Sequence, residues 1–195
     1  MTISDNNRDM SNLILGLDVS TSVTGVCIVD ASKFDGNGSH IIYLDRIEFK
    51  KCVTLWDKAD KVSQELENLK MFYPGGYRVA LEEPLLGFQK GQSSATTITT
   101  LMRFNGIVSY IARGVFAAEP EYISSSHARK VCGIKMQKNS IAGMNGKEQV
   151  FKYMSENDLK HITWPKKKNG VDVDWSRDAT DAYVIARAAS LSQNT

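Results

Sequence analysis

An aspartate interrupts one of the most apolar segments of this 195-residue chain. Residues 13–19 read Leu-Ile-Leu-Gly-Leu-Asp-Val, and near-continuous apolar runs of this kind are typical of strands that are covered on both faces. A carboxylate inside a buried strand costs several kcal/mol unless something compensates its charge. Because folding alone does not explain that cost, Asp18 predicts a functional site on this strand.

The remaining pattern predicts a mixed α/β sheet in a single domain, in the order three strands, helix, strand, helix, strand, helices. The first three strands are expected to form an antiparallel meander. The expected strands cover 13–19, 23–29, 41–49, 79–82 and 122–124, and the expected helices cover 54–71, 94–114 and 178–190, with short helices near Ser126 and at Lys147. We expect a domain over 12–191, tails at 1–11 and 192–195, and a long loop over 161–177.

Three further acids stand at the ends of predicted strands or helices, where they could lie near Asp18. Glu82 ends the apolar strand 79–82. Asp178 and Asp181 stand three positions apart at the start of the last helix, so both project from one face of its first turn. If the strands of Asp18 and Glu82 are neighbours and the helix packs across them, the four carboxylates converge.

Such a cluster predicts a metal site. Four carboxylates within a few ångströms cannot all stay ionised without a divalent cation. Oxygen-only ligands select a hard ion, Mg²⁺ or Mn²⁺, over zinc. Two such ions about 4 Å apart are suited to activating a water and to stabilising the leaving oxygen in phosphodiester hydrolysis. The predicted catalytic residues and metal ligands are therefore Asp18, Glu82, Asp178 and Asp181.

Structural interpretations also exist for most of these acids. Asp178 alone fits a helix N-cap, and Asp181 fits a first-turn acid favoured by the helix dipole. Glu82 and Glu83 point to opposite sides of a strand, so one of them faces solvent. Asp18 is the hardest of the four to explain without function.

Composition limits the class of protein. Hydrophobic residues make up 42% and charged residues 24%, which is typical of a soluble globular protein and excludes wholesale disorder. No stretch approaches the roughly 20 apolar residues of a membrane span, and the N-terminus has no apolar signal core. The three cysteines have the spacing of neither a disulfide framework nor a metal site. We therefore expect a cytoplasmic protein of bacterial or phage type, or one of an organellar matrix.

Charge is unevenly distributed along the chain. Residues 124–170 carry 10 Lys and Arg against 3 Asp and Glu, whereas residues 1–123 carry 12 against 15. A basic block beside carboxylates suits a protein that holds a polyanion near an acidic site. A lysine-rich solvated surface explains the same charges equally well.

The acidic motifs resemble those of the RuvC Holliday-junction resolvases, in the RNase H-like (retroviral integrase) superfamily. Residues 15–20 with Val23-Thr24-Gly25 resemble the opening hairpin, Val79-Ala80-Leu81-Glu82 the second acidic strand, and Asp178-Ala179-Thr180-Asp181-Ala182 the closing aspartate pair. The resemblance covers about residues 12–191. It implies an RNase H-like fold with a three-stranded antiparallel meander plus two parallel strands. It also implies a Mg²⁺-dependent endonuclease that acts as a homodimer and nicks two symmetric strands of a four-way DNA junction.

The candidate DNA-binding residues are mostly basic. Lys147, at a helix start, could meet a phosphate both by charge and by the helix end. Phe88 is placed like the aromatic that this family inserts at the junction centre. The full set is Lys147, Arg129, Lys130, Phe88, Lys90, Lys166, Lys167 and Lys168.

Several alternatives stay open. Glu83-Pro84 follows the matched glutamate, and the loop 161–177 is longer than a minimal family member needs, which affects substrate choice. A nuclease for forks, flaps and three-way DNA, or a junction-binding protein that does not cleave, is compatible with the same motifs. The segment around Asp18 and Gly25 also resembles the phosphate-binding hairpin of the sugar-kinase/actin fold, but that architecture duplicates its domain and this chain shows one copy.

Overall fold

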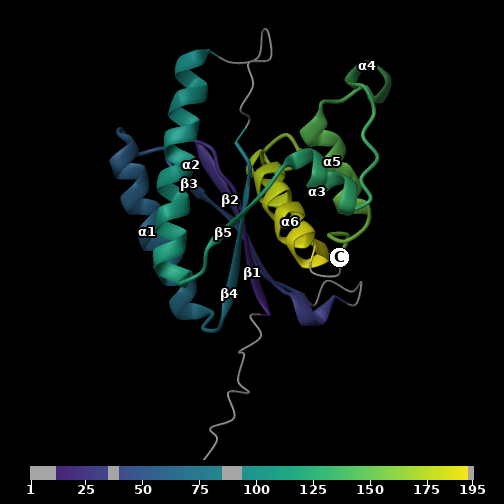
Figure 1. Cartoon of the computed structure of the whole chain (residues 1–195). Helices are drawn as coiled ribbons and strands as arrows, with labels where there is room; N and C mark the ends of the chain where they lie inside the picture. Colours follow the sequence, from purple (N-terminus) through teal and green to yellow (C-terminus); the bar gives the residue numbers. More distant parts are fainter. Residues whose placement is uncertain (1–11, 35–39, 85–93, 193–195) are drawn as a thin grey trace, which may run out of the picture.

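The computed structural model describes residues 12–34, 40–84 and 94–192. Its centre is a five-stranded sheet with the strand order β3-β2-β1-β4-β5 (Figure 1). β1, β2 and β3 are antiparallel neighbours, whereas β4 runs parallel to β1 and β5 parallel to β4. The predicted mixed sheet, a meander plus two parallel strands, is confirmed. The strands are β1 (Leu13–Asp18), β2 (Val23–Asp30), β3 (Ile41–Glu48), β4 (Tyr77–Glu82) and β5 (Pro120–Ile123).

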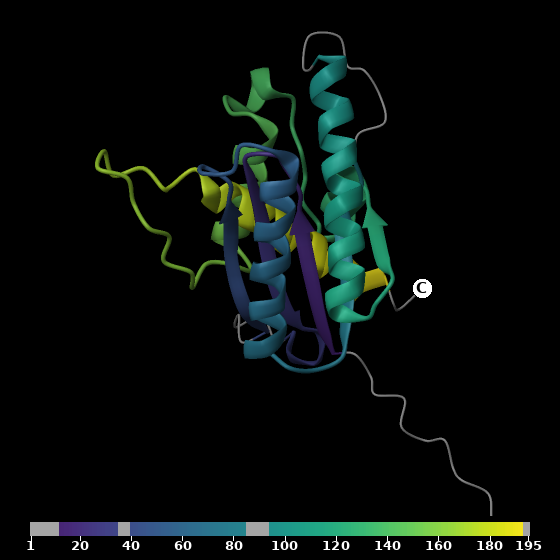
Figure 2. The same cartoon turned by 90° about the vertical axis from the view of Figure 1, so that its left-hand side faces the viewer.

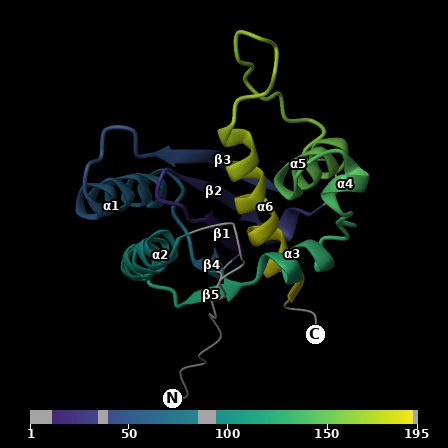
Figure 3. The same cartoon turned by 90° about the horizontal axis from the view of Figure 1, so that it is seen from above.

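Helices cover both faces of the sheet. α1 and α2 lie on one face, and α6 lies on the other with α3 and α5 beside it (Figure 3). Apolar residues recur along α1 at steps of three and four, which turns one stripe of that helix to the sheet. The helices are α1 (Leu55–Phe72), α2 (Ala95–Phe116), α3 (Ser125–Val131), α4 (Asn139–Ala142), α5 (Gly146–Glu156) and α6 (Trp175–Leu191), and a 3₁₀ turn covers Ala31–Lys33.

Side chains of β1 alternate between two core layers. Leu15 and Leu17 pack in the layer under α1 and α2, whereas Ile14 packs in the layer under α6. Since successive side chains of a strand point to opposite faces, the even-numbered positions of β1 face α6. Asp18 is an even-numbered position, so the strand directs it toward α6.

Two glycines let α6 approach the sheet closely. A Cβ at Gly16 would overlap the carbonyl oxygen of Ala182 and come within 2.8 Å of the Ala186 Cβ. A Cβ at Gly25 would overlap the carbonyl group of Asp178. A glycine inside a strand often marks such an approach of another backbone. The first turns of α6 therefore lie directly on β1 and β2.

α6 begins three residues earlier than its sequence pattern predicts. Trp175, its first residue, packs edge-on against Trp164 and lies under the guanidinium of Arg46, 4.0 Å from the ring centre. These contacts come from distant parts of the chain and hold the additional residues in the helix. Asp178 is consequently the fourth residue of α6, and its interpretation as an N-cap is wrong. Asp174 occupies the cap position and makes no side-chain cap hydrogen bond there.

Smaller differences concern short elements. β5 covers Pro120–Ile123 instead of 122–124, because its parallel pairing with β4 sets its bounds. α4 and the 3₁₀ turn were not expected, since elements of three or four residues show no periodicity. All three cysteines are free thiols. Within the described ranges, no helix combines the length and apolar character needed to cross a membrane.

Candidate active site

β1 and β4 bring Asp18 and Glu82 to the same end of the sheet. The two strands are parallel neighbours with Leu17 beside Leu81, and each acid is the last residue of its strand. Asp18 is buried, with 6% of its surface exposed. The neighbouring-strand arrangement on which the predicted cluster depends is therefore present.

Glu82, and not Glu83, joins this group. Ala80 belongs to the core layer under α6, and Glu82 lies two residues further along the same face of β4. The charges of Asp18 and Asp181 act on Glu82. Glu83, by contrast, is exposed. The strand thus directs one glutamate to the acids and its neighbour to solvent.

The ammonium group of Lys147 lies among the other three carboxylates. Asp178 and Asp181 come from the first turns of α6, which rest on β1 and β2. The Nζ atom of Lys147 lies 2.7 Å from Asp178 Oδ1, 3.2 Å from Asp18 Oδ2 and 3.3 Å from Asp181 Oδ2. The structure therefore brings all four predicted acids together, with a lysine between them.

Contacts at the start of α5 fix the position of Lys147. Asn145 caps this helix by accepting a hydrogen bond from the backbone N–H of Glu148. Arg177 of α6 donates two hydrogen bonds to the carboxylate of Glu148, at 3.0 and 3.1 Å. Such a two-pronged pair is geometrically specific. Arg177 thereby ties α5 to α6 and directs Lys147 toward the carboxylates.

Burial and mutual repulsion perturb the acids. Burial and the charge of Asp18 raise the pKa of Glu82 to about 8 and that of Asp181 to about 6. Burial also raises the pKa of Asp178, although Lys147 opposes the change. For Lys147, burial alone lowers the pKa, but the three carboxylates outweigh it and hold the pKa above its usual range. One ammonium group thus does not neutralise the cluster, and a further cation would stabilise it.

The donor set fits a hard divalent cation. The four acids offer carboxylate oxygens alone, a set that favours Mg²⁺ or Mn²⁺. Across residues 12–34, 40–84 and 94–192, however, no three His, Cys, Asp or Glu side chains are already arranged to hold a metal ion. Lys147 occupies the centre of the acidic group instead. Cation binding at this place therefore requires the ammonium group to withdraw.

A basic hollow lies beside the acids. Arg129, Lys130 and Lys135 help to line an open hollow of about 410 Å³ next to α3. Arg129 also lines a narrow gap together with Glu82 and Asp181, and its charge opposes the rise in the pKa of Asp181. Cationic side chains and carboxylates are thus adjacent, as the uneven charge of the sequence suggests.

The remaining predicted DNA contacts are dispersed. Phe88 and Lys90 lie outside the described residues. Lys166, Lys167 and Lys168 lie on the loop that precedes α6, but Lys166 and Lys167 are ion-paired with aspartates of the same loop. Only Lys168 of the three has no such partner within the described part of the chain.

Sequence reasoning missed three residues that position this site. Gly16 and Gly25 admit α6 to the sheet, and Arg177 fixes α5. The glycines carry a readable signal, since an isolated glycine inside a strand pattern suggests a close approach of another backbone. The sequence gives no such signal for Arg177, because its partner Glu148 is 29 residues away on another helix.

Comparison with known proteins matches the fold of this chain to solved structures. No protein-family model and no curated protein matches it. RuvC from T. thermophilus in complex with a Holliday junction substrate has a TM-score of 0.62 at 12% identity, over 93% of this chain and 94% of that one. A second RuvC structure, from Thermus thermophilus, has a TM-score of 0.57 at 14% identity and covers 93% of this chain and 95% of its own. The yeast mitochondrial Holliday junction resolvase Ydc2 has a TM-score of 0.51 at 14% identity, and the match covers 94% of this chain and 81% of that one. This chain therefore has the RNase H-like fold of the RuvC-type resolvases.

Proposed function

We propose that this protein is a DNA endonuclease that resolves four-way junctions by paired, metal-dependent hydrolysis of phosphodiesters. The observation that carries the proposal is the convergence of Asp18, Glu82, Asp178 and Asp181 at one end of the sheet. The fold adds support, because the similar structures include RuvC bound to a Holliday junction. The basic hollow beside the acids provides a surface of the sign that DNA requires.

The four acids would serve as ligands for two Mg²⁺ ions, with Mn²⁺ as a substitute. Bound divalent cations polarise a phosphodiester and lower the pKa of water, so no nucleophile from the protein is required. The chain itself contributes the arrangement of the ligands. β1 and β4 hold Asp18 and Glu82 side by side, and the glycine-mediated contact of α6 places Asp178 and Asp181 over them.

Lys147 would move from the carboxylates to the substrate. When cations occupy the acids, the ammonium group loses its attractive partners and meets repulsion. In a DNA complex, Lys147 would then donate a hydrogen bond to the scissile phosphate. Arg129, between the basic hollow and the acids, would hold a neighbouring phosphate.

Cleavage of synthetic four-way junctions in the presence of Mg²⁺ tests this proposal. We expect the wild-type protein to make paired nicks, and Asp18→Asn and Asp181→Asn to reduce the rate at least ~100-fold, because each removes a metal ligand from the transition state. Both variants should still bind the junction. Asp60→Asn, an exposed acid on α1, is the matched control and should cut normally. Wild-type rates in both site variants would refute the nuclease mechanism.

Substrate choice separates the proposed function from its alternatives. We would compare four-way junctions with three-way, fork, flap and linear duplex DNA under one salt condition, because DNA affinity depends strongly on salt. Preference for four-way junctions supports resolution. Equal cutting of every branched DNA would identify a broader nuclease, and binding without cutting would identify a junction-binding protein.

A further inference from the structure

The loop between α5 and α6 forms a projecting hairpin, residues 165–173, which we call the finger. It extends away from the body of the protein beyond the β3 edge of the sheet (Figures 2 and 3). Lys166 and Asp172 form an antiparallel bridge, and the N–H of Lys167 donates to the carbonyl of Val171 at 2.7 Å. Gly170, with φ of 78°, makes the turn at the tip. The loop is thus a paired hairpin with its own hydrogen bonds.

The root of the finger is anchored in the core. Trp164 is buried and packs against the rings of Phe151 and Trp175. The N–H of Val173 donates to the carbonyl of Pro165 at 3.1 Å and closes the hairpin.

Arg177 extends the anchor to the catalytic helix. Its Nη1 atom donates to the carbonyl oxygens of Asp172 and Val173, while the same guanidinium holds Glu148 of α5. The finger is therefore bound to the elements that carry Asp178 and Lys147. A ligand that contacts the finger is held in a defined position relative to the acidic cluster.

The charges of the finger are concentrated at its tip. Asp172 pairs with Lys166 along the stem, and Asp174, the residue that follows the finger, pairs with Lys167 at 2.6 Å, so these two lysines are neutralised locally. Lys168 is exposed and forms no ion pair within the described residues. The finger is therefore a neutral stem with one cation at the end, unlike a uniformly solvated basic loop.

We propose that the finger grips a duplex arm of the DNA beside the cleavage site, with Lys168 contacting a backbone phosphate. This inference rests on the proposed function, since it takes DNA as the ligand of the acidic cluster. Four residues per strand place the tip on the order of 13 Å from the root of the finger. The contact made by the tip would accordingly lie on the flanking arm and not at the scissile phosphate.

Such a contact selects for duplex flanking the branch. A single strand does not hold a phosphate at a fixed position and a short arm ends before the tip, so the finger adds the most affinity where the arm continues as duplex. Because the stem lysines are already paired with aspartates, replacing Lys168 should remove most of the contribution of the finger.

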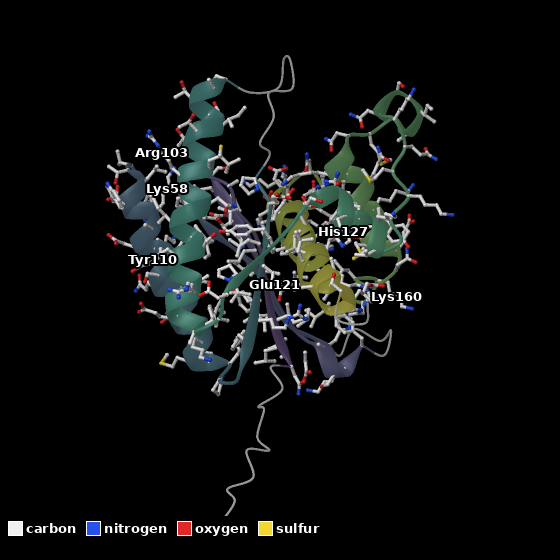
Figure 4. The ribbon with its side chains drawn as sticks, viewed as in Figure 1. Lys58, Arg103, Tyr110, Glu121, His127 and Lys160 are labelled. Carbon is white, nitrogen blue, oxygen red and sulfur yellow. The ribbon has the colours of Figure 1, made fainter. Side chains whose placement is uncertain are left out.

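Junction binding by Lys168 variants tests the proposal. One phosphate contact contributes about 0.9 to the slope of log affinity against log salt, which corresponds to roughly five- to tenfold at 0.1 M salt. We expect Lys168→Ala to weaken binding by that factor and to reduce the salt slope by about one, and Lys168→Glu to weaken it further. A hydroxyl-radical footprint should lose protection on the duplex arm that flanks the branch. Lys160→Ala, at an exposed lysine that precedes the finger in the chain (Figure 4), is the control of equal charge and should leave all three readouts unchanged.

The outcomes distinguish this inference from the proposed function. Unchanged affinity, salt slope and footprint in both Lys168 variants would overturn the role of the finger even if the wild-type protein cuts junctions. If the wild-type protein binds junctions without cutting them and the Lys168 variants lose the footprint, the finger stands and the nuclease proposal fails. If Lys168→Ala and Lys160→Ala lost the same junction affinity, the effect would come from the change in net charge and not from a contact of the finger, which would also overturn the inference.

Discussion

At the scale of single residues, the site depends on which of two neighbouring side chains a strand turns inward. Glu82 faces the acids, where burial and the charge of Asp18 raise its pKa to about 8, whereas Glu83 is exposed. Both burial and the repulsion by a neighbouring carboxylate disfavour the charged form of this side chain. The glutamate pair therefore provides an internal comparison of site and surface.

We expect Glu82→Gln to reduce junction cleavage at least ~100-fold, because the amide offers a neutral oxygen where the proposed metal ligand is charged. Glu83→Gln makes the same chemical change one residue away and should cut at the wild-type rate. Single-turnover cleavage at saturating protein separates the chemical step from binding. Equal loss in both variants would show that the face of β4 does not define the site.

Lys147 makes a second prediction at this scale. It compensates three carboxylates in the protein without metal, so Lys147→Met should lower the melting temperature in EDTA. Mg²⁺ should then stabilise the variant more than the wild-type protein, because the cation no longer competes with an ammonium group. Thermal unfolding across a Mg²⁺ titration measures both effects. A smaller Mg²⁺-induced shift in the variant would mean that lysine and cation do not compete for one place.

At the scale of elements, the contact between α6 and the sheet determines where the aspartates stand. Gly16 and Gly25 have no side chains to hold the helix off, and alanines face them from α6. Close packing of this kind is intolerant of added volume. The helix cannot move outward without carrying Asp178 and Asp181 away from Asp18.

Gly25→Ala tests this geometry, because its methyl group would overlap the carbonyl of Asp178. We expect a loss of about 1–3 kcal/mol in the free energy of unfolding, as for other overpacked sites, together with reduced cleavage by the folded protein. Gly106→Ala, on α2 with open space around it, should instead be neutral or stabilising. Denaturant unfolding and cleavage assays would be run side by side. Full activity in Gly25→Ala would show that the first turn of α6 tolerates displacement.

At the scale of the whole molecule, paired cuts require two active sites related by a two-fold axis like that of the junction. The layer formed by α1 and α2 exposes several large apolar residues, including Trp56, Met71 and Tyr110, and the last is 76% exposed (Figure 4). Met71 and Tyr110 also line an open groove of about 610 Å³ between the two helices. This layer, on the opposite face of the sheet from α6, is where we expect the second copy to bind.

Tyr110→Arg should therefore weaken self-association about tenfold or more, since exposed tyrosines are frequent anchors of interfaces. On a cruciform plasmid, the variant should yield nicked circles where the wild-type protein yields linear DNA. Ile141→Arg, at another exposed apolar residue, on α4, is the control and should leave association unchanged. A Tyr110→Arg protein that stays dimeric in sedimentation experiments would place the interface elsewhere.

Much of this architecture could be predicted from local pattern. Apolar runs and helical stripes predict the order of strands and helices. An acid in a buried run stands out because burying its charge costs free energy whatever the rest of the fold is. Predictions failed where distant residues intervene. The start of α6 depends on Trp164 and Arg46, and the bounds of β5 depend on its pairing with β4.

The amino-acid sequence by itself determined which segments are buried and which carboxylates burial would penalise, because both follow from the type and spacing of neighbouring residues. Only the tertiary structure decided that Lys147 lies between those carboxylates, that Glu82 rather than Glu83 joins them, and that two of the three finger lysines are paired. Such contacts join residues from separate elements, and their energies depend on distances that exist only once the sheet and its helices have packed.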